Sequence, residues 1–263
     1  MESTYNGRVA VVTGGSSGVG LAVAEQLLKE GAYVAICGRD TTRLQNAIEY
    51  LGNFSPSEKF IAVRCDVLKA EDVAVLEKNV MDWQGRCDLL VNNAGQGRVS
   101  TFASTTDEAW REEFDLKFFS QIHTIRAFHA MLKARGDGAI VAVNSLLAYQ
   151  PEPHMVCTSA ARAGVQNLVK SLSIEFAPHV RVNAVLLGLI QSGQWERRFA
   201  ARENKAQTRE DWFAALANAK HIPLGRLGLA AEVAKAIVFL GSTQASYITG
   251  AQIEVSGGLS RYA

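Results

Sequence analysis

The sequence T-G-G-S-S-G-V-G at residues 13–20 lies between an apolar, β-branched run, Val9–Thr13, and an amphipathic run, Gly18–Glu30. This order predicts a strand, a tight glycine-rich turn and a helix. A helix N-terminus in that place offers unpaired N–H groups and a positive dipole end to a diphosphate. The stretch therefore predicts a dinucleotide site near the start of the chain, in preference to a plain glycine turn.

Three glycines of this turn have separate tasks in the prediction. Gly14 permits the tight turn, Gly18 lets the backbone approach the diphosphate, and Gly20 lets the helix pack closely on the sheet. The loop residues expected to bind the cofactor are Gly14, Ser16, Ser17, Gly18, Val19 and Gly20.

Strand-like and helical runs alternate along the rest of the chain. Short apolar runs predict strands at Val9–Thr13, Tyr33–Cys37, Lys59–Cys65, Leu89–Asn92, Ala139–Asn144, Val180–Val185 and Gln252–Val255. Amphipathic runs predict helices at Gly18–Glu30, Thr42–Leu51, Ala70–Trp83, Asp107–Ala134, Thr158–Phe176, Glu196–Ala219 and Ala231–Leu240. Short apolar strands suit a parallel sheet that is covered on both faces. We therefore expect an α/β fold, a Rossmann-type doubly wound parallel sheet of about seven strands in three α/β/α layers.

Composition is that of one globular domain, residues 1–263, since no Pro/Ser-rich linker or low-complexity tract divides the chain. Hydrophobic residues make up 48% of the 263 residues, enough for a sizeable core. The net charge of +1 argues against a nucleic acid or an anionic membrane as partner.

The cysteines indicate no metal site. None forms a C-x-x-C pair, and no histidine lies at ligand spacing from them. Cys37, Cys65 and Cys87 lie at the edges of apolar runs and are expected to be small buried side chains in a reducing compartment. The first residues show no signal-peptide pattern, and no apolar run is long enough to cross a bilayer, so we expect a cytoplasmic protein.

The glycine spacing at residues 13–20 resembles the T-G-x-x-x-G-x-G loop of the short-chain dehydrogenase/reductase family. N-N-A-G at 92–95, P-L-G-R at 223–226 and Y-I-T-G at 247–250 resemble further segments of that family, in its order and over essentially the whole chain. The resemblance implies an NAD(P)(H)-dependent oxidoreductase that interconverts a carbonyl and a secondary alcohol of a small molecule. It also implies a homo-oligomer, either a tetramer or a dimer.

The residue after the second strand favours NADP(H) over NAD(H). NAD-binding proteins of this fold usually place a carboxylate at that strand end for the ribose 2′-hydroxyl. Here Arg39 follows Gly38, and a guanidinium can pair with a 2′-phosphate. Asp40 could still serve as the ribose carboxylate, which keeps NAD(H) open. The resemblance adds further cofactor contacts at Asp66, Val67, Asn93, Ala94, Gly95, Gly188 and Ile190.

The catalytic positions depart from the family pattern, which uses Ser, Tyr and Lys, the last two as Y-x-x-x-K, with an Asn on the preceding helix. The resemblance places Ser145 at the family Ser. Thr158 then replaces the Tyr, Arg162 replaces the Lys, where it could still hold the cofactor ribose, and Lys117 stands in the place of the Asn.

This exchange predicts an altered proton transfer. An aliphatic hydroxyl is far less acidic than a phenol, and a guanidinium stays charged. A lysine that is partly desolvated beside Arg162 would have a lowered pKa, so Lys117 could act as the general acid that Thr158 cannot be. The simpler alternatives are that Thr158 caps the helix that begins there and that Lys117 is a solvated helix lysine.

The resemblance also indicates a substrate pocket. Its wall would include Gln150 and His154, and a mobile lid around residues 190–220 would carry Trp195, unless that indole is core for the following helix. Lys117 and Arg162 together would favour an anionic substrate or an enolate-like intermediate. The competing hypothesis is a protein that binds the nucleotide without ordinary redox activity, as a regulator, a scaffold or an enzyme for a non-redox step.

Overall fold

A seven-stranded sheet in the order β3-β2-β1-β4-β5-β6-β7 forms the centre of the computed structural model, which describes residues 4–202 and 204–261. Each pair of neighbouring strands is parallel. The strands are β1 Val9–Thr13, β2 Tyr33–Gly38, β3 Phe60–Arg64, β4 Leu89–Asn92, β5 Gly138–Ser145, β6 Val180–Leu187 and β7 Gln252–Val255. The predicted fold class and its strands are confirmed.

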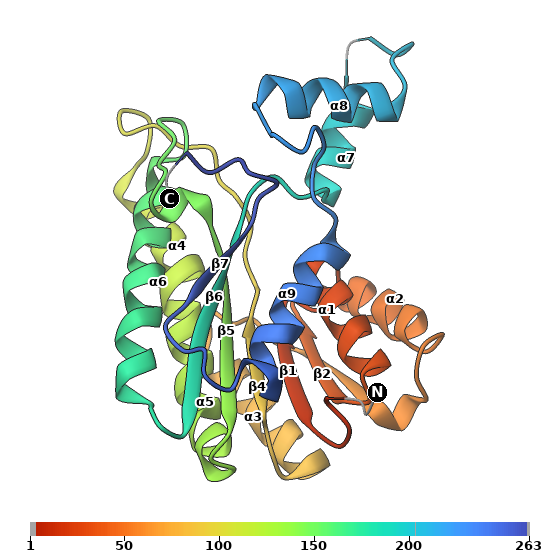
Figure 1. Ribbon diagram of the computed structural model, residues 1–263, viewed down its shortest axis with the longest axis vertical. Helices are drawn as coiled ribbons and strands as arrows, with labels where there is room; N and C mark the ends of the chain where they lie inside the picture. The colour runs from red at the N-terminus through yellow and green to blue at the C-terminus, as the bar shows by residue number, and fades with distance from the viewer. Residues whose placement is uncertain (1–3, 203, 262–263) are drawn as a thin grey trace.

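Helices cover both faces of this sheet (Figure 1). The helices are α1 Gly18–Lys29, α2 Thr41–Leu51, α3 Ala70–Gln84, α4 Asp107–Phe114, α5 Ser120–Ala134, α6 Val156–Glu175, α7 Gly193–Ala200, α8 Arg209–Ala219 and α9 Ala230–Gly241. One core lies under α1, α2 and α9, and a second lies under α3, α5 and α6. Strand β1 serves both, because Ala10 and Val12 point to the first core and Val9 and Val11 to the second.

The strand order reverses between β1 and β4, which are neighbours although β2 and β3 separate them in the chain. In open α/β sheets, ligands bind at such a switch point, outside the carboxyl ends of the strands. Residues 13–20 follow β1 there, and residues 92–95 follow β4. The fold therefore brings the two motifs of the nucleotide prediction to one edge.

Three helix predictions need correction. The predicted helix Asp107–Ala134 consists of α4, a π-helical turn at Asp115–Phe119, and α5, so its winding widens in the middle. The helix predicted from Thr158 begins two residues earlier, at Val156, with Met155 as its N-cap. Thr158 is thus no cap: it lies inside the first turn, and its hydroxyl is used elsewhere.

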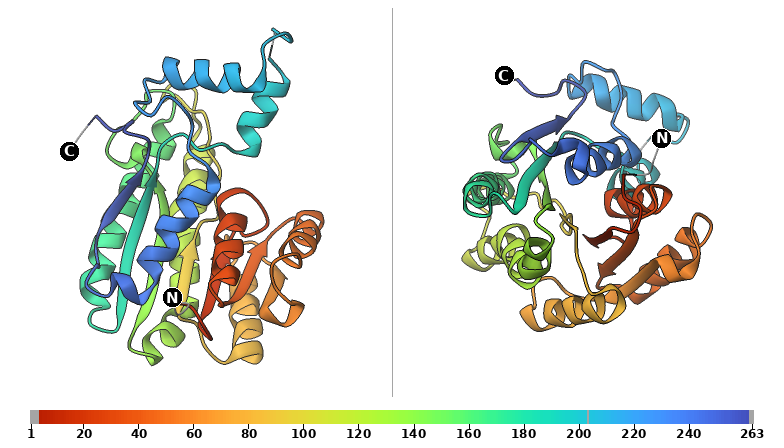
Figure 2. Two further views of the ribbon diagram at one scale, coloured as in Figure 1. Left: turned by 45° about the vertical axis from the view of Figure 1, so that its right-hand side comes forward. Right: turned by 60° about the horizontal axis from the view of Figure 1, so that its bottom comes forward.

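The segment predicted as one helix, Glu196–Ala219, is wrong as a single element. It contains most of α7, which ends at Ala200, and the whole of α8, which begins at Arg209. Thr208 begins α8, because its hydroxyl accepts a hydrogen bond of 3.1 Å from the N–H of Asp211. Both helices project beyond the sheet, in the upper part of both Figure 1 and the left view of Figure 2.

All four cysteines are buried and unpaired, as expected for Cys37, Cys65 and Cys87. Over the part of the chain that the structure describes, no helix has the length and apolar character to cross a membrane. Nor does any group of three or more His, Cys, Asp or Glu side chains in residues 4–202 and 204–261 have an arrangement that could hold a metal ion.

We expect Gly20→Ala to destabilise the fold at the start of α1. A Cβ at this position would lie 2.3 Å from the Gly14 carbonyl oxygen and 2.5 Å from Asn93 Nδ2, so the turn or β4's loop must shift. Overpacking of this kind costs about 1–3 kcal/mol. Urea unfolding measures the effect. Gly52→Ala is the matched control, because its Cβ would come no closer than 3.4 Å to a neighbour; equal stabilities of the two variants would contradict the expectation.

Candidate active site

The turn after β1 has the shape that a diphosphate needs. Gly14 and Gly18 have φ angles of +63° and +56°, which side chains other than glycine rarely adopt. Ser17, the N-cap of α1, makes no side-chain cap hydrogen bond, so the first N–H groups of the helix keep their donor capacity. A Cβ at Gly18 would meet nothing within 4 Å, which leaves open space in front of the turn. The residues present therefore fit a dinucleotide diphosphate.

The N-N-A-G segment is tied directly to this turn. The hydroxyl oxygen of Thr13 accepts hydrogen bonds from the N–H groups of Asn93, at 2.9 Å, and Ala94, at 3.0 Å. Asn93 Nδ2 donates in return to the carbonyl oxygens of Thr13, at 2.9 Å, and Gly14, at 3.2 Å. Thr13 was not among the predicted site residues, although it opens the motif at residues 13–20 and its spacing could have indicated it.

The end of β2 distinguishes the roles of two charged residues. Asp40 is the N-cap of α2: its Oδ1 accepts a hydrogen bond of 3.0 Å from the N–H of Arg43. Arg39 is exposed, and its nearest ion-pair contact is Asp66, at 3.9 Å. One oxygen of the Asp40 carboxylate therefore caps the helix, whereas the Arg39 guanidinium is exposed beside Asp66, at the predicted adenine position.

Lys117 lies in the π-helical turn, and its side chain is 1% exposed, so the alternative of a solvated helix lysine is wrong. Its Nζ donates to the carbonyl oxygen of Gln96, one residue beyond the N-N-A-G segment. A Cβ on Gly95 would lie 3.9 Å from Lys117 Nζ and 3.8 Å from Arg162 Nη2. The two cations therefore converge on one point beside this loop.

Glu113 completes the cluster, and sequence reasoning missed it. Its side chain is 2% exposed, and its Oε1 lies 3.4 Å from Lys117 Nζ. The hydroxyl of Thr158 donates to the same oxygen. The signal was available, because residues four apart on a helix face each other, and Glu113 and Lys117 have that spacing.

Burial dominates the electrostatics of both cations. Together with the charges of Arg162 and Arg98, and against the opposing Glu113 carboxylate, it lowers the pKa of Lys117 to about 8. Burial also lowers the pKa of Arg162 to about 10. At neutral pH both groups carry a proton, but only Lys117 has a pKa close enough to neutrality for it to exchange that proton readily.

Ser145 ends β5, and the Arg162 guanidinium reaches this strand from α6. Arg162 Nη1 donates to the carbonyl oxygen of Val143 at 2.7 Å. Ser145 is the last residue of the strand, where its hydroxyl donates to the Leu187 carbonyl at 3.4 Å and accepts from the Leu147 N–H at 3.3 Å. The structure thus gathers Lys117, Thr158 and Arg162 around one loop, with Ser145 two residues along the strand that Arg162 contacts.

The predicted cofactor contacts beyond β6 follow the end of that strand. Gly188 has no room for a side chain, because a Cβ there would lie 2.8 Å from the Cα of Ser256. Ile190 is buried and pairs with Gly228 through an isolated bridge. Val67 is also buried, directly after Asp66.

Lys117, Glu113, Thr158 and Arg162 form what we call the Lys117 cluster. The three predicted substrate residues make no hydrogen bond or ion pair with it in the described part of the chain. Gln150 is buried, and its Oε1 accepts a hydrogen bond of 2.9 Å from the N–H of Arg261. His154 is half-exposed, 3.8 Å from Glu152. Trp195 packs in a small apolar cluster, with its ring centroid 6.4 Å from that of Trp212. That packing favours the alternative in which Trp195 is core.

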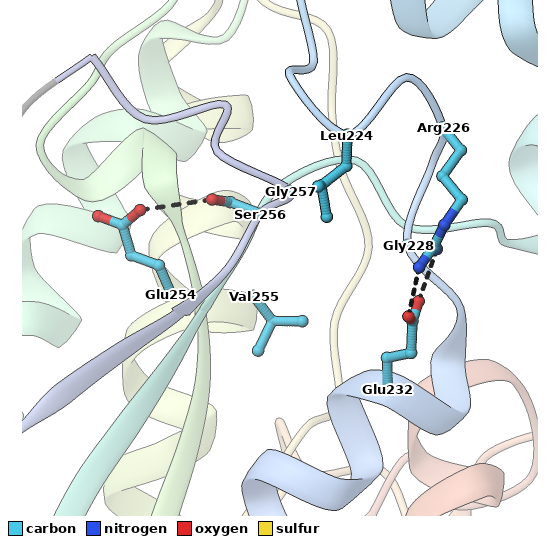
Figure 3. A pocket seen from close by; sticks show the side chains of 8 residues that line it. All are labelled: Leu224, Arg226, Gly228, Glu232, Glu254, Val255, Ser256 and Gly257. Carbon is cyan, nitrogen blue, oxygen red and sulfur yellow. Dashed lines mark hydrogen bonds and ion pairs between the residues drawn. The ribbon is translucent and has the colours of Figure 1, made fainter.

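A separate pocket lies between α9 and the segment after β7 (Figure 3). Its charged side chains already have partners: Arg226 binds Glu232 through contacts of 2.9 and 2.6 Å, and Glu254 accepts hydrogen bonds from Ser256, at 3.4 Å, and from Tyr149. None of the predicted site residues lines it, and we assign the candidate active site to the Lys117 cluster.

Comparison with known proteins shows which family the chain belongs to. A family model described as enoyl-(acyl carrier protein) reductase matches residues 14–260. The NADPH-bound structure of a short chain oxidoreductase from Pseudomonas aeruginosa PAO1, described as containing an atypical catalytic center, is 58% identical and superposes with a TM-score of 0.93 over 98% of this chain and 100% of that one. The chain belongs to the short-chain dehydrogenase/reductase family.

Other members of the family are more distant but similar over the full length. The L-sorbose reductase of Gluconobacter frateurii, complexed with NADPH and L-sorbose, is 31% identical, with a TM-score of 0.94 and 100% of both chains covered. The 3-oxoacyl-[acyl-carrier-protein] reductase of Chlamydia muridarum is 32% identical over 98% of this chain and 100% of its own length. The chain is therefore an oxidoreductase-family protein over its whole length.

We expect Thr13→Val to destabilise the junction of the two motifs. Valine keeps the shape but leaves the N–H groups of Asn93 and Ala94 without their acceptor, which costs about 1–3 kcal/mol. Urea unfolding measures the loss. Thr13→Ser keeps the hydroxyl and serves as control. A Thr13→Val protein as stable as the serine variant would show that these hydrogen bonds do not hold the loops.

Proposed function

We propose that this protein is an NADP(H)-dependent oxidoreductase that interconverts a carbonyl and a secondary alcohol, with Lys117 as the group that transfers the proton. The observation that carries the proposal is the position of Lys117: its ammonium is buried, lies at the loop after β4, and has a pKa of about 8. A group with a pKa near the working pH is the most effective general acid and base.

The preference for NADP(H) rests on the end of β2. Arg39 is exposed there and can pair with a 2′-phosphate, while the Asp40 carboxylate already accepts the cap hydrogen bond of α2. The NADPH-bound relatives from P. aeruginosa and G. frateurii support the same choice. NAD(H) remains the second cofactor to test.

The four catalytic residues have distinct proposed tasks. When bound, the cofactor supplies or accepts the hydride. Lys117 Nζ gives a proton to the carbonyl oxygen during reduction and takes it back during oxidation, and solvent restores its charge. Ser145 donates a hydrogen bond that polarises the carbonyl. Arg162 holds the cofactor ribose, and Thr158 exchanges no proton, because its hydroxyl is committed to Glu113.

The charge of the site favours a substrate with an anionic or strongly polarised oxygen. Lys117 Nζ and Arg162 Nη2 approach the same point beside Gly95 and carry two positive charges against the one of Glu113. Oriented cations in a dry site stabilise negative charge that develops on oxygen. The aromatic cluster of α7 and α8 would form the lid over this site, around residues 190–220.

Lys117→Met removes the proton donor and keeps an unbranched apolar side chain. We expect kcat to fall by at least about 100-fold, because a positioned acid or base contributes 10²–10⁴ in rate, while NADPH binding stays close to that of the wild type. NADPH oxidation with a panel of carbonyl compounds measures the first, and calorimetry the second. Lys133→Met, at an exposed position of α5, is the control.

Two results would contradict the assignment. Unchanged turnover in Lys117→Met would remove Lys117 from the mechanism. A wild-type protein that is stabilised by NADPH but turns over no member of a broad carbonyl and alcohol panel would instead support the nucleotide-binding alternative without ordinary redox activity.

Arg39→Ala tests the choice of cofactor. Loss of a charge-assisted contact to the 2′-phosphate is worth about 1.5–3 kcal/mol, so we expect the Kd for NADPH to rise about 10- to 100-fold. The Kd for NADH, which lacks that phosphate, stays unchanged and is the internal control. Isothermal titration calorimetry measures both constants, and an equal effect on the two nucleotides would contradict the role of Arg39.

A further inference from the structure

Glu113 is a buried carboxylate to which the proposed chemistry assigns no task. It lies in the last turn of α4, and one of its oxygens contacts both the ammonium of Lys117, at 3.4 Å, and the hydroxyl of Thr158. Burying an ionised carboxylate is costly unless cations and hydrogen-bond donors compensate it. Here a cation from the π-helical turn and a donor from α6 converge on one oxygen.

Among the charged groups that shift the pKa of Lys117, Glu113 is the one that raises it. The charges of Arg162, on α6, and of Arg98, in the loop between β4 and α4, both lower the pKa of Lys117. Arg98 itself pairs with Glu112, at 2.7 Å. Among the residues that the structure describes, Glu113 is the anion within ion-pair distance of Lys117 Nζ, and the other neighbour is the neutral carbonyl of Gln96.

We propose that Glu113 is the positioning residue of this site: its carboxylate, oriented by the Thr158 hydroxyl, holds the Lys117 ammonium at the Gln96 carbonyl. This inference rests on the proposed function in so far as Lys117 transfers the proton. Thr158 thereby supports the cluster that carries the chemistry, instead of acting at the place where the family has a tyrosine.

Removal of the Glu113 charge has a predictable sign. Without the anion, Lys117 keeps the effects of burial, Arg162 and Arg98, all of which lower its pKa. An opposite charge at this distance shifts a pKa by about 1–3 units, so the protonated form of Lys117 would be lost at a lower pH by that amount. Reduction requires the protonated form, and its alkaline limit would move down with it.

The titration of Lys117 can be observed without turnover or cofactor. In protein labelled with ¹³C at lysine Cε, the Lys117 signal is assigned as the one missing from Lys117→Met and is followed against pH. We expect a midpoint near pH 8 in the wild type and a midpoint about 1–3 units lower in Glu113→Gln. Glu108→Gln, the same substitution at an exposed position of α4, leaves the midpoint in place.

Conservative variants separate positioning from packing. Glu113→Asp keeps the charge but withdraws it by one methylene, so its midpoint lies between those of the wild type and Glu113→Gln, and it carries the test if the glutamine variant does not fold. An unchanged Lys117 midpoint in the variants that fold would overturn the inference. The titration reports on Glu113 alone: if it shifts but the wild type reduces no substrate, the proposed function fails and the inference stands.

Discussion

The hydroxyl of Thr13 joins the ends of β1 and β4, and both halves of the site depend on that junction. The two strands are neighbours, but the chain leaves them in different directions, so their loops separate at the switch point. Thr13 holds the two loops together, because its hydroxyl oxygen accepts hydrogen bonds from the N–H groups of Asn93 and Ala94. On one side it fixes the turn at residues 14–20. On the other it fixes the loop to which Lys117 is hydrogen-bonded through Gln96. The loops proposed to bind the nucleotide and to hold the proton donor are therefore anchored to the same few atoms.

The charges of the cluster set what each residue can do. Glu113, Lys117 and Arg162 bring one negative and two positive charges into a region of low solvent exposure, where isolated charges are costly. Arg162 makes a hydrogen bond to Val143, yet its Nε is buried without a protein partner in the described part of the chain. A buried donor left unpaired is costly, so this nitrogen suits an oxygen from a ligand. A bound ligand could therefore supply the hydrogen-bond acceptor that Arg162 Nε lacks among the described residues.

The sequence predicts the sheet well because its strands are buried on both faces, and buried strands show as apolar runs such as Val9–Thr13 and Leu89–Asn92. It fails where tertiary contacts decide. Thr158 is a good N-cap residue by propensity, but the helix begins at Val156. There Ser100 accepts hydrogen bonds from the N–H groups of Val156 and Cys157. The Thr158 hydroxyl donates to the buried Glu113 carboxylate instead. Glu113 was overlooked for the converse reason: a glutamate in a charged helix is typical of solvent exposure, and its burial follows from the partners that α6 and the π-helical turn supply.

Two family residues are replaced here by cations of different kinds: a lysine at position 117 and an arginine at position 162. The chemistry of each side chain suits its position. An arginine keeps its charge under all ordinary conditions, so at position 162 it can hold a ribose or a substrate oxygen but transfers no proton. A lysine loses its proton readily once it is desolvated, and position 117 is the more buried of the two. Reversing the two residues would preserve the net charge but would put the residue that can lose its proton at the less buried position. The arrangement therefore places the fixed cation on α6, at the strand end, and the variable cation on the π-helical turn. On that turn, the Glu113 carboxylate opposes the loss of the Lys117 proton, whereas burial favours the loss of that proton.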